Sequence, residues 1–132
     1  KEVNNVIHPN LIFHNRFLFE EEFSAALGCS KIALNFLRKM NRDLQTSRSV
    51  EIPACGGFML AERTDEHMQL FEEGKEAEFF SSKEELLQKV QYYLQHDTER
   101  LAIAKAGYDR CFKDNYTFEN RMQGILNKVF DV

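Results

Sequence analysis

One short stretch of the chain contains side chains that could bind an anion and a sugar together. Arg48 and Glu51 stand three positions apart, so on a helix both side chains would lie on the same face. The Arg48 guanidinium can pair with an anion, and the Glu51 carboxylate can accept two hydroxyl hydrogen bonds at once, which suits a ribose diol. Asp43, eight residues before Glu51, could reach the same cleft from the preceding loop.

The same spacing also fits a plain ion pair on a solvent-exposed helix face. Such a pair stabilises a helix by only about a few tenths of a kcal/mol, and spacing alone favours this interpretation. Gly56 and Gly57 have an equally plain explanation, because glycine commonly supplies the left-handed residue that ends a helix.

The expected position of this stretch supports a binding role. A strand over 31–37 leads through the polar loop 38–47 into a helix that begins near Arg48 and ends at Gly56. In open parallel sheets, ligands bind beyond the carboxyl ends of the strands. Free N–H groups from Ser47 to Ser49 would then form an anion site, with Arg48 adding a positive charge.

Short apolar runs and helical patterns alternate along the middle of the chain. Strands are expected at 31–37, 57–62 and 77–80, and the second of them is continuous rather than alternating in its apolar residues, as is typical of strands covered on both faces. The helix after Arg48 and a second one from Thr64 or Asp65 to Gly74 separate them. This order predicts a parallel sheet with right-handed crossovers and helices on both faces.

The region 81–132 is expected to be helical, because apolar residues recur there at helical spacing after three candidate N-caps. These candidate caps are Ser82 with Glu85 three residues later, Asp97 or Thr98, and Thr117. Ahead of the strands, the segment 17–28 predicts a helix ending at Gly28, and the segment 6–13 predicts an edge strand interrupted by Pro9.

Composition indicates one globular domain over residues 1–132, with 43% hydrophobic and 29% charged residues. A net charge of −4 argues against nucleic-acid binding, and no apolar run is long enough to span a membrane. The cysteines Cys29, Cys55 and Cys111 are scattered, which predicts reduced, buried thiols in a cytoplasmic protein, and no metal-ligand spacing is found. Since the chain does not begin with Met, we expect it to be a piece of a longer protein.

Four motifs in a fixed order carry a resemblance to a known family. They are "SKIALNF" (30–36), the R-x-x-E-x-x-A-C-G-G pattern (48–57), the F-E-x-G-x-E-A-x-F-F turn (71–80) and "RLAIAKAG" (100–107). Together they resemble the C-terminal segment of CgeB-like glycosyltransferases, which belong to the group-1, GT-B-type transferases. The resemblance extends from about Ser24 to Gly124.

This resemblance implies a retaining-type transferase of two Rossmann-like domains, of which the chain is part of the one that binds the nucleotide-sugar donor. Glu51 corresponds to a glutamate associated with the nucleotide ribose, and Asp43 to a catalytic acid near the donor sugar. Arg48, Gly56 and Gly57 would lie beside the same cleft. No cofactor or metal is implied, because the nucleotide sugar is a substrate and catalysis rests on positioning and on stabilising the departing diphosphate.

Two positions depart from the family pattern. Asp43 is one methylene shorter than the usual glutamate, and Val50 stands where relatives often carry an aromatic residue.

The expected fold is therefore α/β: a partial Rossmann-like three-layer domain with a small parallel sheet and C-terminal helices, half of a GT-B C-terminal domain. The missing N-terminal part of the same protein would bind an unknown acceptor, so these 132 residues alone should not transfer sugar. Two other interpretations stay open. One is a non-catalytic α/β interaction or scaffolding module, and the other is a receiver-like domain phosphorylated on Asp43, although the acidic pair and lysine of such domains do not accompany it.

Overall fold

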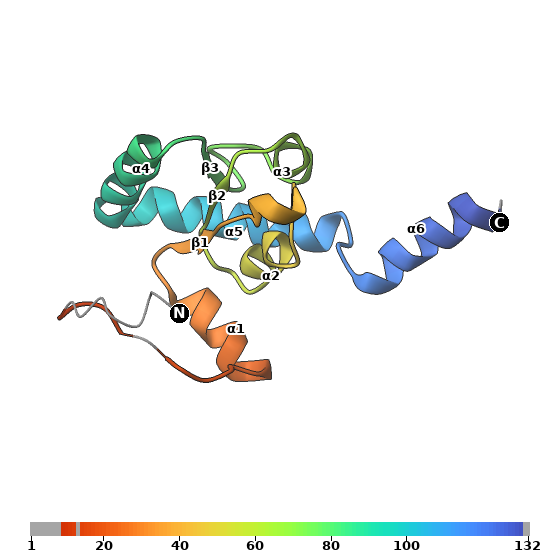
Figure 1. Cartoon of the computed structure of the whole chain (residues 1–132), viewed down its shortest axis with the longest axis horizontal. Helices are drawn as coiled ribbons and strands as arrows, with labels where there is room; N and C mark the ends of the chain where they lie inside the picture. The colour runs from red at the N-terminus through yellow and green to blue at the C-terminus, as the bar shows by residue number, and fades with distance from the viewer. Residues whose placement is uncertain (1–8, 13, 131–132) are drawn as a thin grey trace.

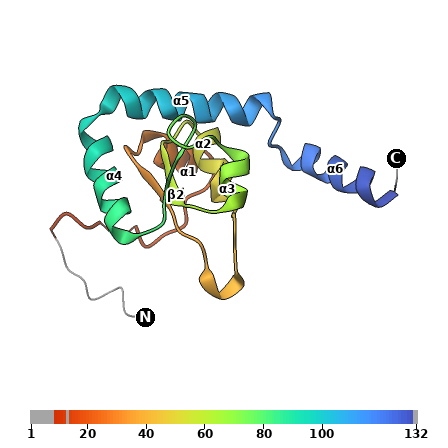
Figure 2. The same ribbon diagram turned by 90° about the horizontal axis from the view of Figure 1, so that it is seen from above.

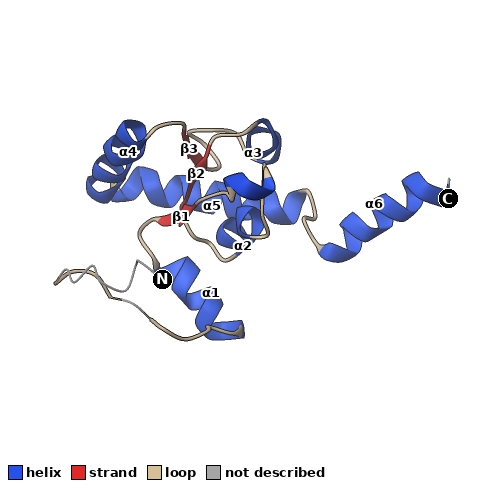
Figure 3. Ribbon diagram, viewed as in Figure 1, coloured by secondary structure: helices blue, strands red, loops and turns tan. Residues whose placement is uncertain are grey.

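The computed structural model of the protein describes residues 9–12 and 14–130. Within them, strands and helices alternate as far as the third strand, and the chain is helical from there on (Figures 1 and 3). The elements are α1 (Glu20–Cys29), β1 (Ala33–Asn35), the 3₁₀ helix η2 (Lys39–Asn41), α2 (Arg48–Ala54), β2 (Met59–Glu62), α3 (Asp65–Leu70), β3 (Glu78–Phe80), α4 (Lys83–Gln95), α5 (Asp97–Lys113) and α6 (Phe118–Phe130).

The three strands form one parallel sheet in the order β1-β2-β3. Ala33 of β1 aligns with Met59 of β2, and Leu60 of β2 aligns with Glu78 of β3. All three expected strands are present, although each is shorter than its apolar run. The predicted class, a partial Rossmann-like α/β fold with a small parallel sheet, is confirmed.

Both faces of the sheet are covered by helices, because alternate residues of the central strand point to opposite sides. Met59 and Ala61 of β2 pack on one side with Ile52 of α2. Leu60 packs on the other side with Tyr93 of α4. Each of these five residues is buried, which explains why β2 reads as a continuous apolar run.

Helix α5 runs alongside the sheet and joins the two cores (Figure 2). Its Ile103 belongs to the α4 side and its Cys111 to the α2 side. Gly107 lies between them, where a Cβ atom would collide with the backbone carbonyl oxygen of Glu76 and would lie 3.4 Å from Cβ of Pro53. A glycine is therefore required for α5 to pack this closely against the backbone of the segment that precedes β3.

Three of the predicted helix starts are confirmed. The side chains of Thr64, Ser82 and Thr117 accept hydrogen bonds from the backbone N–H groups of residues 67, 85 and 120, respectively. The prediction for α5 is wrong, because its N-cap is His96 and no side chain caps it. Asp97 lies inside the helix and forms an ion pair with Arg100 at 2.6 Å instead.

Of the two elements predicted at the amino-terminal end, the helix is present but the edge strand is not seen in the described residues. Helix α1 does not stop at Gly28 but continues to Cys29. The edge strand predicted at 6–13 lies largely outside the described residues, and residues 9–12 form no strand.

A charged cluster holds β3 and α4 to the end of β2. Arg63 donates from Nη2 and Nη1 to the two carboxylate oxygens of Glu85, at 2.7 and 3.0 Å, and also pairs with Glu73 at 2.5 Å. The backbone N–H of Ser81 donates to Glu85 at 2.8 Å. The pKa of Glu85 is lowered to about 2, and the largest cause is its hydrogen bonding to Arg63.

Helix α6 extends away from the body of the molecule (Figures 1 and 2). None of its residues is buried, although its apolar residues recur at the predicted helical spacing. Only its first turn lies close to α2, and this contact forms part of the pocket described below.

We expect Gly107→Ala to lower the free energy of unfolding by about 1–3 kcal/mol, because the added methyl group overpacks the contact between α5 and the Glu76 carbonyl. Thermal or urea unfolding would measure it. Gly124→Ala is the matched control: no atom lies within 4 Å of a Cβ placed there. Alanine favours a helix over glycine, so this control should be neutral or more stable by up to about 1 kcal/mol. Equal destabilisation by both changes would contradict the packing argument.

The pKa of Glu85 also predicts a pH dependence of stability. Because folding lowers this pKa from 4.5 to about 2, the stabilisation from Glu85 is complete above about pH 4.5 and is lost as the pH falls towards 2. The difference in melting temperature between the parent protein and Glu85→Gln should therefore shrink over that range. Glu72→Gln, which removes only an exposed pair with Lys75, should change the melting temperature little at any pH.

Candidate functional site

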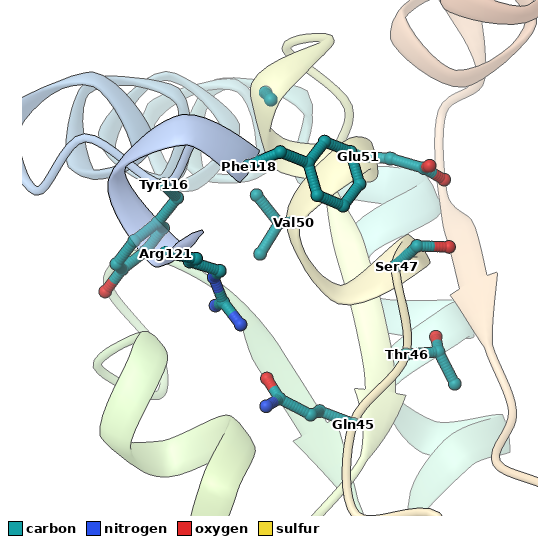
Figure 4. A pocket seen from close by; sticks show the side chains of 9 residues that line it. Gln45, Thr46, Ser47, Val50, Glu51, Tyr116, Phe118 and Arg121 are labelled. Atoms are coloured by element: carbon teal, nitrogen blue, oxygen red, sulfur yellow. The ribbon is translucent and has the colours of Figure 1, made fainter. Parts of the chain in front are cut away.

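A pocket lies between the amino-terminal half of α2 and the start of α6 (Figure 4). Its volume is about 460 Å³. Since the loop after β1 feeds directly into α2, the pocket is on the side of the carboxyl ends of the strands, where ligands bind in such sheets. The lining residues are Gln45, Thr46, Ser47, Val50, Glu51, Ala54, Tyr116, Phe118 and Arg121.

Of the residues predicted from sequence, the structure brings Ser47 and Glu51 to this pocket. Arg48 does not line it. Its guanidinium pairs with Glu51 at 2.6 Å and lies 4.3 Å from the centre of the Phe23 ring of α1. The plain interpretation, an ion pair along the helix, is thus found in the structure, and Arg48 donates its hydrogen bond to one oxygen of the Glu51 carboxylate, Oε2. That carboxylate is about one third exposed.

The other predicted site residues lie elsewhere. Asp43 is half-buried in the loop after η2, where its backbone N–H donates to the carbonyl of Arg38, and it does not line the pocket. Gly56 is in the left-handed conformation, with φ +76°, and it ends α2 as the plain interpretation required. It lines a separate cavity of about 110 Å³, at the opposite end of the helix from Ser47.

Gly57 is buried against α1 and α2. A Cβ atom on it would lie 2.7 Å from the carbonyl oxygen of Leu27 and 3.2 Å from Ile52. This position therefore keeps two helices in close contact and does not face the pocket that Glu51 lines.

Of the amides predicted to form an anion site at the amino end of α2, that of Ser49 already has a backbone partner. The backbone N–H of Ser49 donates to the carbonyl of Thr46 at 3.0 Å, and that of Val50 donates to the carbonyl of Ser47 at 3.1 Å. These amides are used in closing the first turn, because the helix begins with a tight turn of the 3₁₀ type. The helix also has only seven residues.

The positive charge in the pocket comes from a residue that sequence reasoning missed. Arg121 of α6 projects towards Gln45 across the pocket, whereas the Glu51 carboxylate points away on the far side of Phe118 (Figure 4). The Arg121 guanidinium lies 5.9 Å from the centre of the Tyr116 ring. Within the described part of the chain it forms no ion pair with a carboxylate, so its charge is available to an anion.

The turn between α5 and α6 places Arg121 at this position. The Tyr116 hydroxyl donates to the carbonyl of Leu70 at 3.0 Å, and the Tyr116 N–H donates to the carbonyl of Cys111 at 3.0 Å. Asn115 adopts a left-handed conformation, with φ 51°. The sequence carried one partial signal for this turn, the Thr117 cap, but nothing in the helical pattern showed that α6 would meet α2.

The described residues include no helix that is both long enough and apolar enough to cross a membrane. No group of His, Cys, Asp and Glu side chains in that part of the chain has an arrangement that could hold a metal ion. The pocket is therefore characterised by aromatic surfaces, hydroxyl and amide groups, one carboxylate and one guanidinium.

Comparison with known proteins identifies a family. No curated protein and no solved structure matches the chain significantly. A family model described as glycosyl transferase-like matches residues 4–127, which is nearly the whole chain. This match favours a role in glycosyl transfer over the scaffolding module considered above. The chain belongs to the glycosyl transferase-like family.

Proposed function

We propose that the chain binds the nucleotide-sugar donor of a glycosyltransferase in the pocket between α2 and α6. The observation that carries this proposal is the guanidinium of Arg121, without a carboxylate partner among the described residues, on the wall of a pocket at the carboxyl ends of parallel strands. Membership of the glycosyl transferase-like family supports the reaction class. The motif resemblance supports the finer assignment to the CgeB-like, GT-B-type enzymes.

The pocket offers a partner for three parts of such a donor, which are the diphosphate, the base and the ribose. A guanidinium pairs with a diphosphate through two parallel hydrogen bonds, which assigns the diphosphate to Arg121. The ring of Phe118 offers an aromatic face for the base. The Glu51 oxygen that is not paired with Arg48 is on the far side of Phe118 from Arg121, so it would accept a ribose hydroxyl only from a nucleotide that passes around the Phe118 ring. Ser47 also lines the pocket.

In glycosyl transfer, the bond between the anomeric carbon and the diphosphate oxygen breaks while an acceptor hydroxyl oxygen bonds to that carbon, and the hydroxyl proton passes to the departing diphosphate. Negative charge develops on the leaving diphosphate, and a fixed cation stabilises it. We assign this role to Arg121 and propose no separate cofactor, because the nucleotide sugar is itself the substrate. Asp43 stays a candidate for contact with the donor sugar, and the acceptor would bind to another part of a two-domain enzyme.

The role of Arg121 predicts a loss of binding that depends on its position. We expect Arg121→Ala to weaken binding of uridine or guanosine diphosphate and their sugars to the intact protein by about tenfold or more, because a charged hydrogen bond is lost. Lys128→Ala removes the same charge from an exposed site two turns further along α6 and is the matched control. Isothermal titration measures both affinities. Equal affinity in the parent and Arg121→Ala would show that the diphosphate does not bind here.

The role of Glu51 can be separated from a general effect of its charge. We expect Glu51→Ala to weaken binding of the better of the two nucleoside diphosphates, because a hydroxyl acceptor is lost. This loss should disappear when the nucleotide lacks both ribose hydroxyls, since the carboxylate then has nothing to bind. Arg48→Ala breaks the ion pair but keeps the carboxylate, so it should not reproduce the loss. An equal loss with the deoxygenated nucleotide would exclude a contact to the ribose.

A further inference from the structure

Three buried polar side chains lie directly beneath the loop that forms one wall of the pocket. They are Asn35 at the end of β1, Ser49 in the first turn of α2 and His67 in α3. Ser49 and His67 are completely inaccessible and Asn35 is 3% exposed, so none of them can touch a ligand in the pocket. The Ser49 hydroxyl oxygen lies 2.7 Å from Nε2 of His67 and 3.2 Å from Nδ2 of Asn35.

The hydrogen-bonding capacity of these groups permits one consistent arrangement of protons. The Ser49 oxygen accepts from Nδ2 of Asn35 and from the backbone N–H of Thr46, at 3.0 Å, so both of its acceptor positions are used. Its own hydrogen must then be donated to Nε2 of His67. Nδ1 of His67 lies 2.6 Å from the carbonyl oxygen of Glu62, which can only accept, so the imidazole is neutral with its proton on Nδ1.

This cluster is connected to the pocket wall by further hydrogen bonds. The backbone N–H of Thr46 donates to the Ser49 hydroxyl oxygen, and the Thr46 hydroxyl lies 3.4 Å from the amide oxygen of Asn35. The Thr64 hydroxyl donates to the carbonyl of Leu44 at 2.6 Å, and the same oxygen accepts from the backbone N–H of His67. The loop 44–47 is therefore fixed to the carboxyl ends of β1 and β2 through side chains that are themselves buried or half-buried.

We propose that Ser49, oriented by neutral His67 and by Asn35, is a positioning residue that holds the loop 44–47 in the conformation that forms the donor pocket. The inference that this matters for donor binding rests on the proposed function. The inference that Ser49 fixes the loop does not rest on the proposed function, because it concerns the structure of the loop and not the identity of the ligand. Removing the hydroxyl leaves Asn35, His67 and the Thr46 N–H without their common partner, and the nearest relief is for the loop to move towards water.

The first experiment measures amide hydrogen exchange in the intact protein without any ligand. We expect Ser49→Ala to accelerate exchange in residues 44–47 by about tenfold, the change that one lost buried hydrogen bond makes in an equilibrium constant. Tyr93→Phe is the matched control, because it removes another buried hydroxyl, 2.7 Å from Glu78, on the opposite face of the sheet. Unchanged exchange at 44–47 in Ser49→Ala, or the same acceleration in the control, would overturn the proposal.

A second pair of variants keeps the test decisive if Ser49→Ala does not fold. His67→Leu removes the acceptor for the Ser49 hydrogen, whereas His67→Gln keeps a side-chain oxygen that can accept it. We expect faster exchange at 44–47 in His67→Leu and parent-like exchange in His67→Gln. Equal exchange in the two variants would show that the acceptor at position 67 does not position the loop.

The third measurement connects the loop to the ligand. We expect Ser49→Ala to weaken binding of uridine or guanosine diphosphate. The control Tyr93→Phe should bind the nucleotide as the parent does when both variants are measured equally far below their own melting temperatures. Parent-like affinity together with accelerated exchange would limit the role of Ser49 to loop structure and contradict its role in the pocket. Absence of nucleotide binding in the parent would instead disprove the proposed function, and hydrogen exchange would still decide the positioning role.

Discussion

The hydrogen bond from the Ser49 hydroxyl to His67 is the contact on which the geometry of the pocket depends. It joins the first turn of α2 to α3, and through Asn35 and the Glu62 carbonyl it also joins the ends of two neighbouring strands. Polar groups at 0% exposure are costly unless each finds a partner, and here every one of them does. A fully satisfied buried network admits few alternative arrangements, which is why a loop as polar as 38–47 can have a defined position.

The side chains of helix α2 point in different directions, although the residues are adjacent in sequence. An α-helix completes one turn every 3.6 residues, so neighbouring side chains point in different directions and face different surroundings. Ile52 is in the core, Arg48 lies over a ring of α1, and Glu51 reaches the pocket. Gly56 ends the helix at a second cavity. A motif that looks like one site in the sequence is thus divided among the core, the contact with α1 and the ligand pocket.

The cationic side chains differ in whether carboxylates surround them. Arg63 and Lys89 are both surrounded by carboxylates, including Glu73, and this network ties β3 and α4 to the end of β2. Their charges are neutralised locally and add little to the field in the pocket. Arg121 has no such partner among the described residues and has an aromatic ring beside it. In a chain with a net charge of −4, this isolated guanidinium is the feature that best attracts an anion to the pocket.

Local pattern determined the elements of this protein. A continuous apolar run marked β2, and a shorter, mainly apolar run marked β3. Thr64, Ser82 and Thr117 marked helix starts, because caps and strand burial depend on residues close together in sequence. The motifs likewise indicated a glycosyltransferase family, and two of the residues singled out from the sequence, Ser47 and Glu51, line the pocket. Only the tertiary structure decided that Arg121 replaces Arg48 as the cation of the pocket and that His67 is buried beneath it. Those contacts join residues from distant parts of the chain. The packing of α6 and α3 against α2 determines them, and local sequence spacing does not predict this packing.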